Sequence, residues 1–232
     1  MNNNCSKKFW GGRAAYSISR GVLAALAVLA VSGIASAQDK KEGVSFSSIS
    51  SPTTPTAITP EAGNTAFLVG HAFGTQGYVC TLDPVHGGTS WTVNNARPEA
   101  TLFTNAFGQP FQIITHFQSI NANPKPGVSV PLGGNVTWQS SFDTSKVWAK
   151  AIGMVKAGDD PDSCPNSGSI PCVLLQSIGN QEGPTGGKLL AHVTFIQRLN
   201  TKGGAAPTDV CSDGQTQLQP YTADYFFYRA AE

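Results

Sequence analysis

The sequence is poor in charged residues. Lys, Arg, Asp and Glu make up 12% of the 232 residues, about half of the ~25% that is usual in soluble domains. This scarcity excludes a coiled coil and a chain kept disordered by charge. The formal net charge is only +1 and no basic block lies beyond residue 37. That argues against a protein that binds nucleic acid by neutralising phosphates.

Long segments without turn residues are also missing. The 25 Gly and 15 Pro residues interrupt the chain too often for long helices. Short β-branched and aromatic runs lie between Gly, Pro and Asn clusters, as they do in sandwiches and barrels. The pattern predicts an all-β, single-domain protein, an antiparallel β-sandwich or a partly closed barrel with few or no helices.

Ten segments have the composition of strands. They are 66–69, 77–82, 90–93, 101–103, 111–117, 136–140, 146–155, 173–178, 189–199 and 223–229. Segment 146–155 does not alternate cleanly, which leaves a short helix as an alternative there. HVTFIQRLN alternates well, with Val193, Phe195, Gln197 and Leu199 on one face and His192, Thr194, Ile196 and Arg198 on the other.

Residues 1–37 have the organisation of a secretory signal peptide. The basic residues Lys7, Lys8, Arg13 and Arg20 precede or flank an apolar stretch from Val22 to Val31, and Ala35-Ser36-Ala37 precedes Gln38. The stretch is shorter than the ~20 residues that span a bilayer, which favours cleavage after Ala37 over a retained anchor. We therefore predict a secreted or periplasmic protein with no membrane span in its mature chain. Removing four basic residues leaves 11 basic residues against 14 acidic ones.

The remaining chain divides into two parts. In residues 38–60, 12 of 23 positions are Ser, Thr or Pro, and so little apolar surface predicts a flexible or extended leader. Residues 61–232 are long enough for one β domain with a sizeable core.

Four cysteines remain after the signal, namely Cys80, Cys164, Cys172 and Cys211. An even number in an oxidising compartment predicts two disulfides, for which three connectivities exist. The turn-rich segment PNSGSIP favours Cys164 with Cys172, which leaves Cys80 with Cys211.

Several motifs in register resemble one family. They are GTQGYVC ending at Cys80, Trp91, RPEATLF (97–103), ITHF ending at Phe117, VTWQSSFDTSKVWAKAI (136–152), HVTFIQRLNTKGGAAPTDVC (192–211) and YTADYFFY (221–228). Together they resemble domain of unknown function 3455, found in exported bacterial and fungal proteins, over about residues 62–228. The resemblance implies no catalytic residues. Its pattern has an aromatic residue where this chain has Cys172, so the bridge from Cys164 is expected to be a local addition.

Metal, cofactor and hydrolase signatures are weak. The histidines His71, His86, His116 and His192 lack metal-ligand spacing, and no dinucleotide or phosphate-loop fingerprint is present. We expect neither metal nor cofactor. Asp143 and His116 could form an acid/base pair with Ser145 or Ser141 as nucleophile, although FDTS also reads as a turn held by Asp143. The acidic segment GDDPDSCPNSG lacks the EF-hand period and reads as a solvated loop.

Aromatic residues on strands are the main positive feature. Trp138 and Tyr225 are the best candidates for an exposed ligand-binding face, because aromatic rings on a β-sheet stack sugars or line apolar pockets. The sequence therefore favours a non-enzymatic extracytoplasmic binding or surface-interaction module for a neutral or apolar small ligand or a glycan. The alternative is a hydrolase-like enzyme that uses Asp143 and His116.

Overall fold

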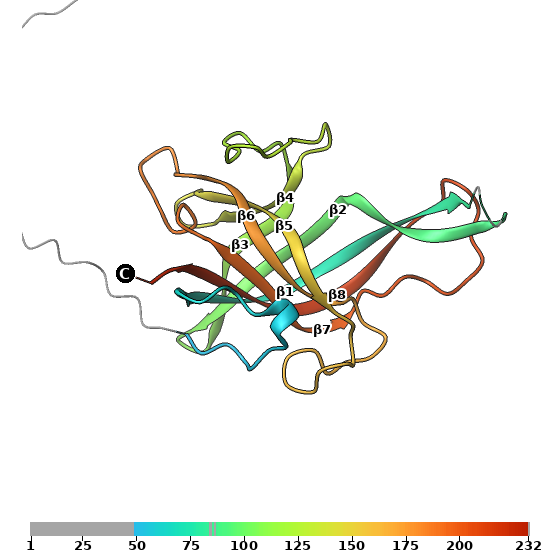
Figure 1. Cartoon of the computed structure of the whole chain (residues 1–232), viewed down its shortest axis with the longest axis horizontal. Helices are drawn as coiled ribbons and strands as arrows, with labels where there is room; N and C mark the ends of the chain where they lie inside the picture. Colours follow the sequence, from blue (N-terminus) through green and yellow to red (C-terminus); the bar gives the residue numbers. More distant parts are fainter. Residues whose placement is uncertain (1–48, 84, 86, 232) are drawn as a thin grey trace, which may run out of the picture. The chain divides into compact units, whose positions relative to one another are not determined.

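The computed structural model describes residues 49–83, 85 and 87–231, without the side chains at positions 95–98. Eight strands and one short 3-10 helix form in these residues (Figure 1). They are η1 (Thr56–Ile58), β1 (Asn64–Leu82), β2 (Thr89–Ala106), β3 (Gln109–Ser119), β4 (Asn135–Ser140), β5 (Lys146–Val155), β6 (Cys172–Gln181), β7 (Phe195–Gly203) and β8 (Thr216–Ala230). The described part of the chain contains no helix long and apolar enough to cross a membrane.

The strands form one closed antiparallel barrel. Each strand pairs with the next along the chain, and β8 pairs with β1 from Asn64↔Ala230 to Val79↔Thr216. The predicted all-β antiparallel fold is confirmed. Closure gives the sheet an interior, where alternate side chains of every strand meet.

Two pairs of expected strands are fused into single strands, β1 and β2. Gly74 lies in the middle of β1, and a Cβ built there would be 2.2 Å from the carbonyl oxygen of Glu99 on β2. Glycine at this point permits a close approach of two backbones and does not end the strand. Segment 146–155 is the strand β5, so the helical alternative is wrong. β7 starts at Phe195 because residues 188–193 form turns, with Ala191 N donating to Lys188 O.

The two faces of β8 lie in two different hydrophobic clusters. Tyr225 and Phe227 point into the barrel interior, whereas Phe226 and Tyr228 pack outside it against Ile58 and neighbouring residues. Strict alternation along β8 produces this division. The strand is therefore buried on both faces.

Residues 49–60 differ from the flexible leader that composition predicts. Ile49 N donates to Ala66 O at 3.0 Å, and Ile58 in η1 has no exposed surface. Gln197 on β7 donates to the Ile58 carbonyl at 2.6 Å. One buried isoleucine and these backbone contacts attach an otherwise polar segment to the outer face of the barrel.

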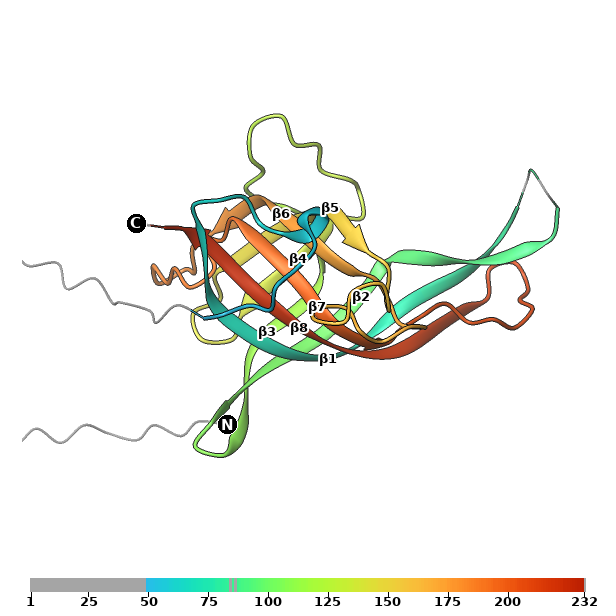
Figure 2. The same ribbon diagram turned by 60° about the horizontal axis from the view of Figure 1, so that its bottom comes forward.

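Both predicted disulfides are present, Cys80–Cys211 and Cys164–Cys172. Cys80 lies near the end of β1, and its bridge joins this strand to the segment before β8. β1, β2 and β8 extend beyond the other strands (Figures 1 and 2). Cys172 begins β6, and its bridge closes the loop before that strand. The proposed signal peptide, residues 1–37, lies outside the described residues.

Peptide mapping under non-reducing conditions should recover Cys80 linked to Cys211 and Cys164 linked to Cys172. Replacing Cys80 and Cys211 together by Ser should lower the free energy of unfolding by about 2 to 5 kcal/mol, because a long loop of the unfolded chain is released. Denaturant titration measures the difference. Recovery of Cys80 linked to Cys164 would show that the connectivity is wrong.

Candidate functional site

Three aromatic rings meet inside the barrel, from His116 on β3, Trp138 on β4 and Tyr225 on β8. The His116 and Trp138 rings are stacked, with centroids 4.2 Å apart and planes inclined by 12°. Tyr225 lies 5.8 Å from His116 and 5.9 Å from Trp138, tilted against both. His116 and Trp138 are direct partners in the β3–β4 register, so their side chains leave the same face side by side.

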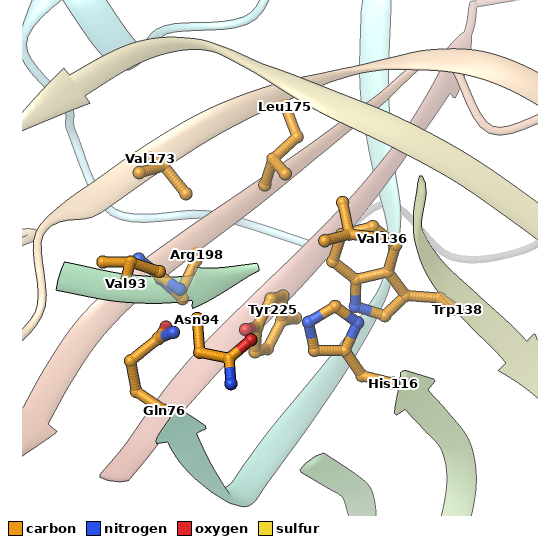
Figure 3. A pocket seen from close by; sticks show the side chains of 10 residues that line it. All are labelled: Gln76, Val93, Asn94, His116, Val136, Trp138, Val173, Leu175, Arg198 and Tyr225. Carbon is orange, nitrogen blue, oxygen red and sulfur yellow. The ribbon is translucent and has the colours of Figure 1, made fainter. Parts of the chain in front are cut away.

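Next to these rings is a cavity of about 120 Å³ (Figure 3). It is lined by Gln76, Val93, Asn94, His116, Val136, Trp138, Val173, Leu175, Arg198 and Tyr225. The wall formed by Val136, Val173 and Leu175 is apolar, whereas Arg198 supplies a positive charge. Val93 is 52% exposed, so the cavity reaches solvent at β2.

His116 is a neutral hydrogen-bonding group at neutral pH. Burial lowers its pKa to about 4; a backbone hydrogen bond to Thr137 opposes this change and the positive charge of Arg198 adds to it. Its Nδ1 lies 2.9 Å from the Thr137 carbonyl oxygen. Because a carbonyl only accepts, the neutral ring carries its proton on Nδ1, and Nε2 is an acceptor.

Two buried donors at this cavity have no hydrogen-bond partner among the described residues, Nε1 of Trp138 and Nε of Arg198. Trp138 is 1% exposed. In Figure 3 its indole nitrogen is on the ring edge turned away from the strand that carries Trp138. Arg198 uses Nη2 to donate to Pro171 O at 2.9 Å. Buried donors normally have partners, so each of these two groups can take a further acceptor.

The binding candidates Trp138 and Tyr225 both line this cavity. The sequence pattern predicts them on an exposed face, and that part of the prediction is wrong. Each is 1% exposed. Their strands alternate, and the barrel directs these positions inward. A ligand can meet them only inside the barrel.

The structure does not bring Asp143 and His116 together. Asp143 lies in the β4–β5 turn, where its carboxylate accepts from Ser145 N at 3.1 Å, Ser145 Oγ at 2.7 Å and Leu189 N at 2.9 Å. Burial raises the pKa of Asp143, but these bonds and one from Ser140 outweigh it and lower the pKa overall. Ser145 has no exposed surface. These contacts are those of a turn that anchors residues 189–190.

The other histidines are dispersed. His71 on the outer face contacts Asp224, with Nδ1 and Oδ1 2.6 Å apart, and Asn200 donates to the second carboxylate oxygen. His192 lies among turns outside the barrel, and His86 lies outside the described residues. In the described part of the chain no three His, Cys, Asp or Glu side chains gather as metal ligands would.

The acidic segment forms a loop stabilised by its own contacts. Asp160 accepts from both the backbone N and the hydroxyl of Ser163, at 2.7 and 2.6 Å. These bonds lower the pKa of Asp160.

Ser141, the other candidate nucleophile, is exposed, and its hydroxyl accepts from Gln112 at 3.3 Å.

Arg198 is the residue that the sequence analysis did not select. HVTFIQRLN places Arg198 on the same face as Ile196, but nothing in the sequence says which face of this strand lies inside. The structure directs Ile196 and Arg198 inward and Phe195 and Leu199 outward.

A family model described as a protein of unknown function, DUF3455, matches residues 60–229. No curated protein and no solved structure matches the chain.

The stability of the barrel should fall as the pH is lowered from about 6.5 to about 4. In this range His116 binds a proton in the unfolded chain but not in the fold, where its pKa is about 4. The contribution of neutral His116 to the free energy of unfolding is complete above pH 6.5, and roughly 3 kcal/mol of it is lost by pH 4. Urea titrations at several pH values measure it.

The His116→Gln variant serves as the comparison for this loss. It keeps every other titrating group, so the difference between the two proteins isolates His116. An identical pH dependence in both proteins would contradict the burial of a neutral histidine.

Proposed function

Since this chain belongs to the DUF3455 family of proteins of unknown function, we propose its function from the geometry: it is an exported, non-enzymatic protein that binds a small ligand inside its barrel. The observation that carries this proposal is the cavity of about 120 Å³ beside the stacked rings of His116 and Trp138. Binding sites are concave and mostly apolar, with a few placed polar groups. This cavity has that composition.

The cavity volume limits the ligand. A protein cavity of ~150 Å³ holds benzene, and this cavity of about 120 Å³ is smaller, so a group smaller than benzene fits among the side chains as they stand. A larger ligand would enter with one such group and extend past Val93, which is half exposed. The site therefore suits a small molecule or one end of a longer molecule.

A binding role also agrees with the positions of the polar groups. Ser145 is buried, and its hydroxyl donates to Asp143 and accepts from Leu190 N at 2.9 Å, so it is not free to attack a substrate. His116 is separated from that turn and bonded to Thr137. No observation favours the hydrolase alternative.

Two features support export. The N-terminal residues 1–37 have the order of a signal peptide, with basic residues, an apolar stretch and Ala35-Ser36-Ala37. Two disulfides join all four cysteines that would remain after cleavage, and such bridges persist in oxidising compartments.

Intact-mass measurement of the protein recovered outside the cytoplasm should give a chain that begins at Gln38. A recovered chain that retains Val22 to Val31 would contradict cleavage. A chain found only inside the cell, with its cysteines reduced, would contradict export.

The binding proposal is tested with the exported protein and a panel of small aromatic and aliphatic acids, amides, alcohols and sugars, using NMR and tryptophan fluorescence. Trp138→Phe should weaken binding of the panel members that bind by at least tenfold, because it removes the unpartnered indole donor and ring area at the cavity. A tenfold change corresponds to about 1.4 kcal/mol.

Trp148→Phe is the matched control. Trp148 is equally buried, but its Nε1 donates to Ser119 Oγ at 3.0 Å and it does not line the cavity. It should change stability and leave affinity within twofold. Equal losses of affinity in both variants, or binding that survives Trp138→Phe unchanged, would place the ligand elsewhere.

A further inference from the structure

Arg198 is the charged residue of the cavity, and no negative charge compensates it in the described part of the chain. The ion pairs of His71 with Asp224 and of Lys188 with Glu182 do not involve Arg198. The hydrogen bond that Arg198 makes, from Nη2 to Pro171 O, is to a neutral carbonyl. A partly buried cation without a counter-ion is unfavourable unless a ligand or water completes its surroundings.

The titratable groups that sense Arg198 are neutral. Burial raises the pKa of Tyr78 and raises that of Tyr221 well above its ordinary value, although the charge of Arg198 acts in the opposite direction on both. His116 is neutral as well. The Tyr78 hydroxyl donates a hydrogen bond to Gly204 O, and the Tyr221 hydroxyl forms one with the Tyr225 hydroxyl. None of these groups therefore supplies an anion.

The buried cavity groups without a partner in the described part of the chain are both donors. They are Nε of Arg198 and Nε1 of Trp138. A carboxylate accepts only, offers two oxygens, and binds a guanidinium more strongly than a neutral acceptor does. A hydroxyl or an amide is a weaker partner for the guanidinium, because it carries no negative charge.

On this basis, and resting on the proposed function, we infer that the barrel binds a small monocarboxylic acid whose carboxylate pairs with Arg198. The apolar part of the acid lies against Val136, Val173 and Leu175 and beside the ring of Tyr225. Figure 3 shows Tyr225 between Arg198 on one side and His116 with Trp138 on the other. The β7–β8 register agrees, because Arg198 and Tyr225 are direct partners.

The single charge of Arg198 and the volume of the cavity favour a small monocarboxylic acid over other anions. One guanidinium matches one negative charge, whereas a phosphate monoester carries ≈ −1.5 to −2 at neutral pH. The cavity of about 120 Å³ leaves space for a short branched chain next to the acidic group, and the ring of a larger acid extends past the half-exposed Val93. The mildly acidic composition of the mature chain does not oppose this binding, since the local charge of Arg198 decides it.

The test compares benzoate with benzamide, which has the same shape without the charge, by calorimetry on the exported protein. Benzoate should bind at least tenfold more tightly than benzamide. In Arg198→Gln the preference should disappear, mainly through weaker benzoate binding. Arg198→Lys should retain part of it, because the charge remains but the planar fork is lost.

Lys188→Gln is the control for general electrostatics. It removes the same unit charge from a residue that does not line the cavity and that pairs with Glu182 at 3.0 Å. The preference for benzoate should persist in this variant. If Arg198→Gln fails to fold, the comparison of benzoate with benzamide in the unmodified protein still decides the charge of the ligand.

Three results would overturn the inference. Benzamide binding as tightly as benzoate, with both weakened by Trp138→Phe, would keep the interior ligand site but reject the carboxylate. Phenyl phosphate binding more tightly than benzoate, with the same dependence on Arg198, would replace the carboxylate by a phosphate. Absence of any binding that depends on Trp138, for the acids and for the whole panel, would reject the proposed function itself.

Discussion

The pairing of β1 with β8 is the constraint on which the rest of the structure depends. It extends over most of β1, from Asn64 to Val79, and it turns an open sheet into a barrel with an interior. In an open sheet, the faces that carry His116, Trp138 and Arg198 would meet solvent or a second layer. In the closed sheet, side chains from β3, β4, β7 and β8 converge, and the backbone that holds them has no free edge along β1 or β8. The convergence of these side chains therefore follows from closure.

A second consequence concerns the outside of the barrel. β7 and β8 carry apolar residues on both faces, and those on the outer face pack with Ile58 of η1. Gln197 shows how this cover is held: its side chain donates to Ile58 O and accepts from the Tyr228 hydroxyl. A buried amide that is satisfied in this way costs little. Because the segment around η1 packs on the face that carries Phe195 and Leu199, the opposite face with Ile196 and Arg198 points into the barrel.

The sequence predicts the fold class, most strand positions and both disulfides, because these depend on local patterns. Alternation defines strands, turn residues separate them, and an even number of cysteines with one short loop favours one pairing. It does not predict the position of the site. HVTFIQRLN separates Arg198 from Phe195 and Leu199 correctly, but the apolar face would ordinarily be taken as the interior. That assignment is reversed because the polar segment 49–60 covers the apolar face, and its composition gives no sign of doing so. Trp138 and Tyr225 are at the site and yet buried because closure of the barrel turns their faces inward.

Buried donors elsewhere in the barrel are a reference for the unpartnered donors at the cavity. Trp148 and Trp138 are both 1% exposed, yet Trp148 donates to Ser119 Oγ and Trp138 donates to nothing in the described structure. Lys125, whose pKa is lowered by burial, donates to Ser177 O at 2.8 Å. Two other buried atoms lack partners among the described residues, Gln118 Oε1 and Asn135 Oδ1, and they are acceptors that do not line the cavity. Within the described part of the chain, the two buried donors without a partner both belong to residues that line one cavity, and one of these residues is the cation Arg198. Selection for stability alone would pair or remove them, whereas a site that must accept an anion and release it again requires donors that the protein does not occupy itself.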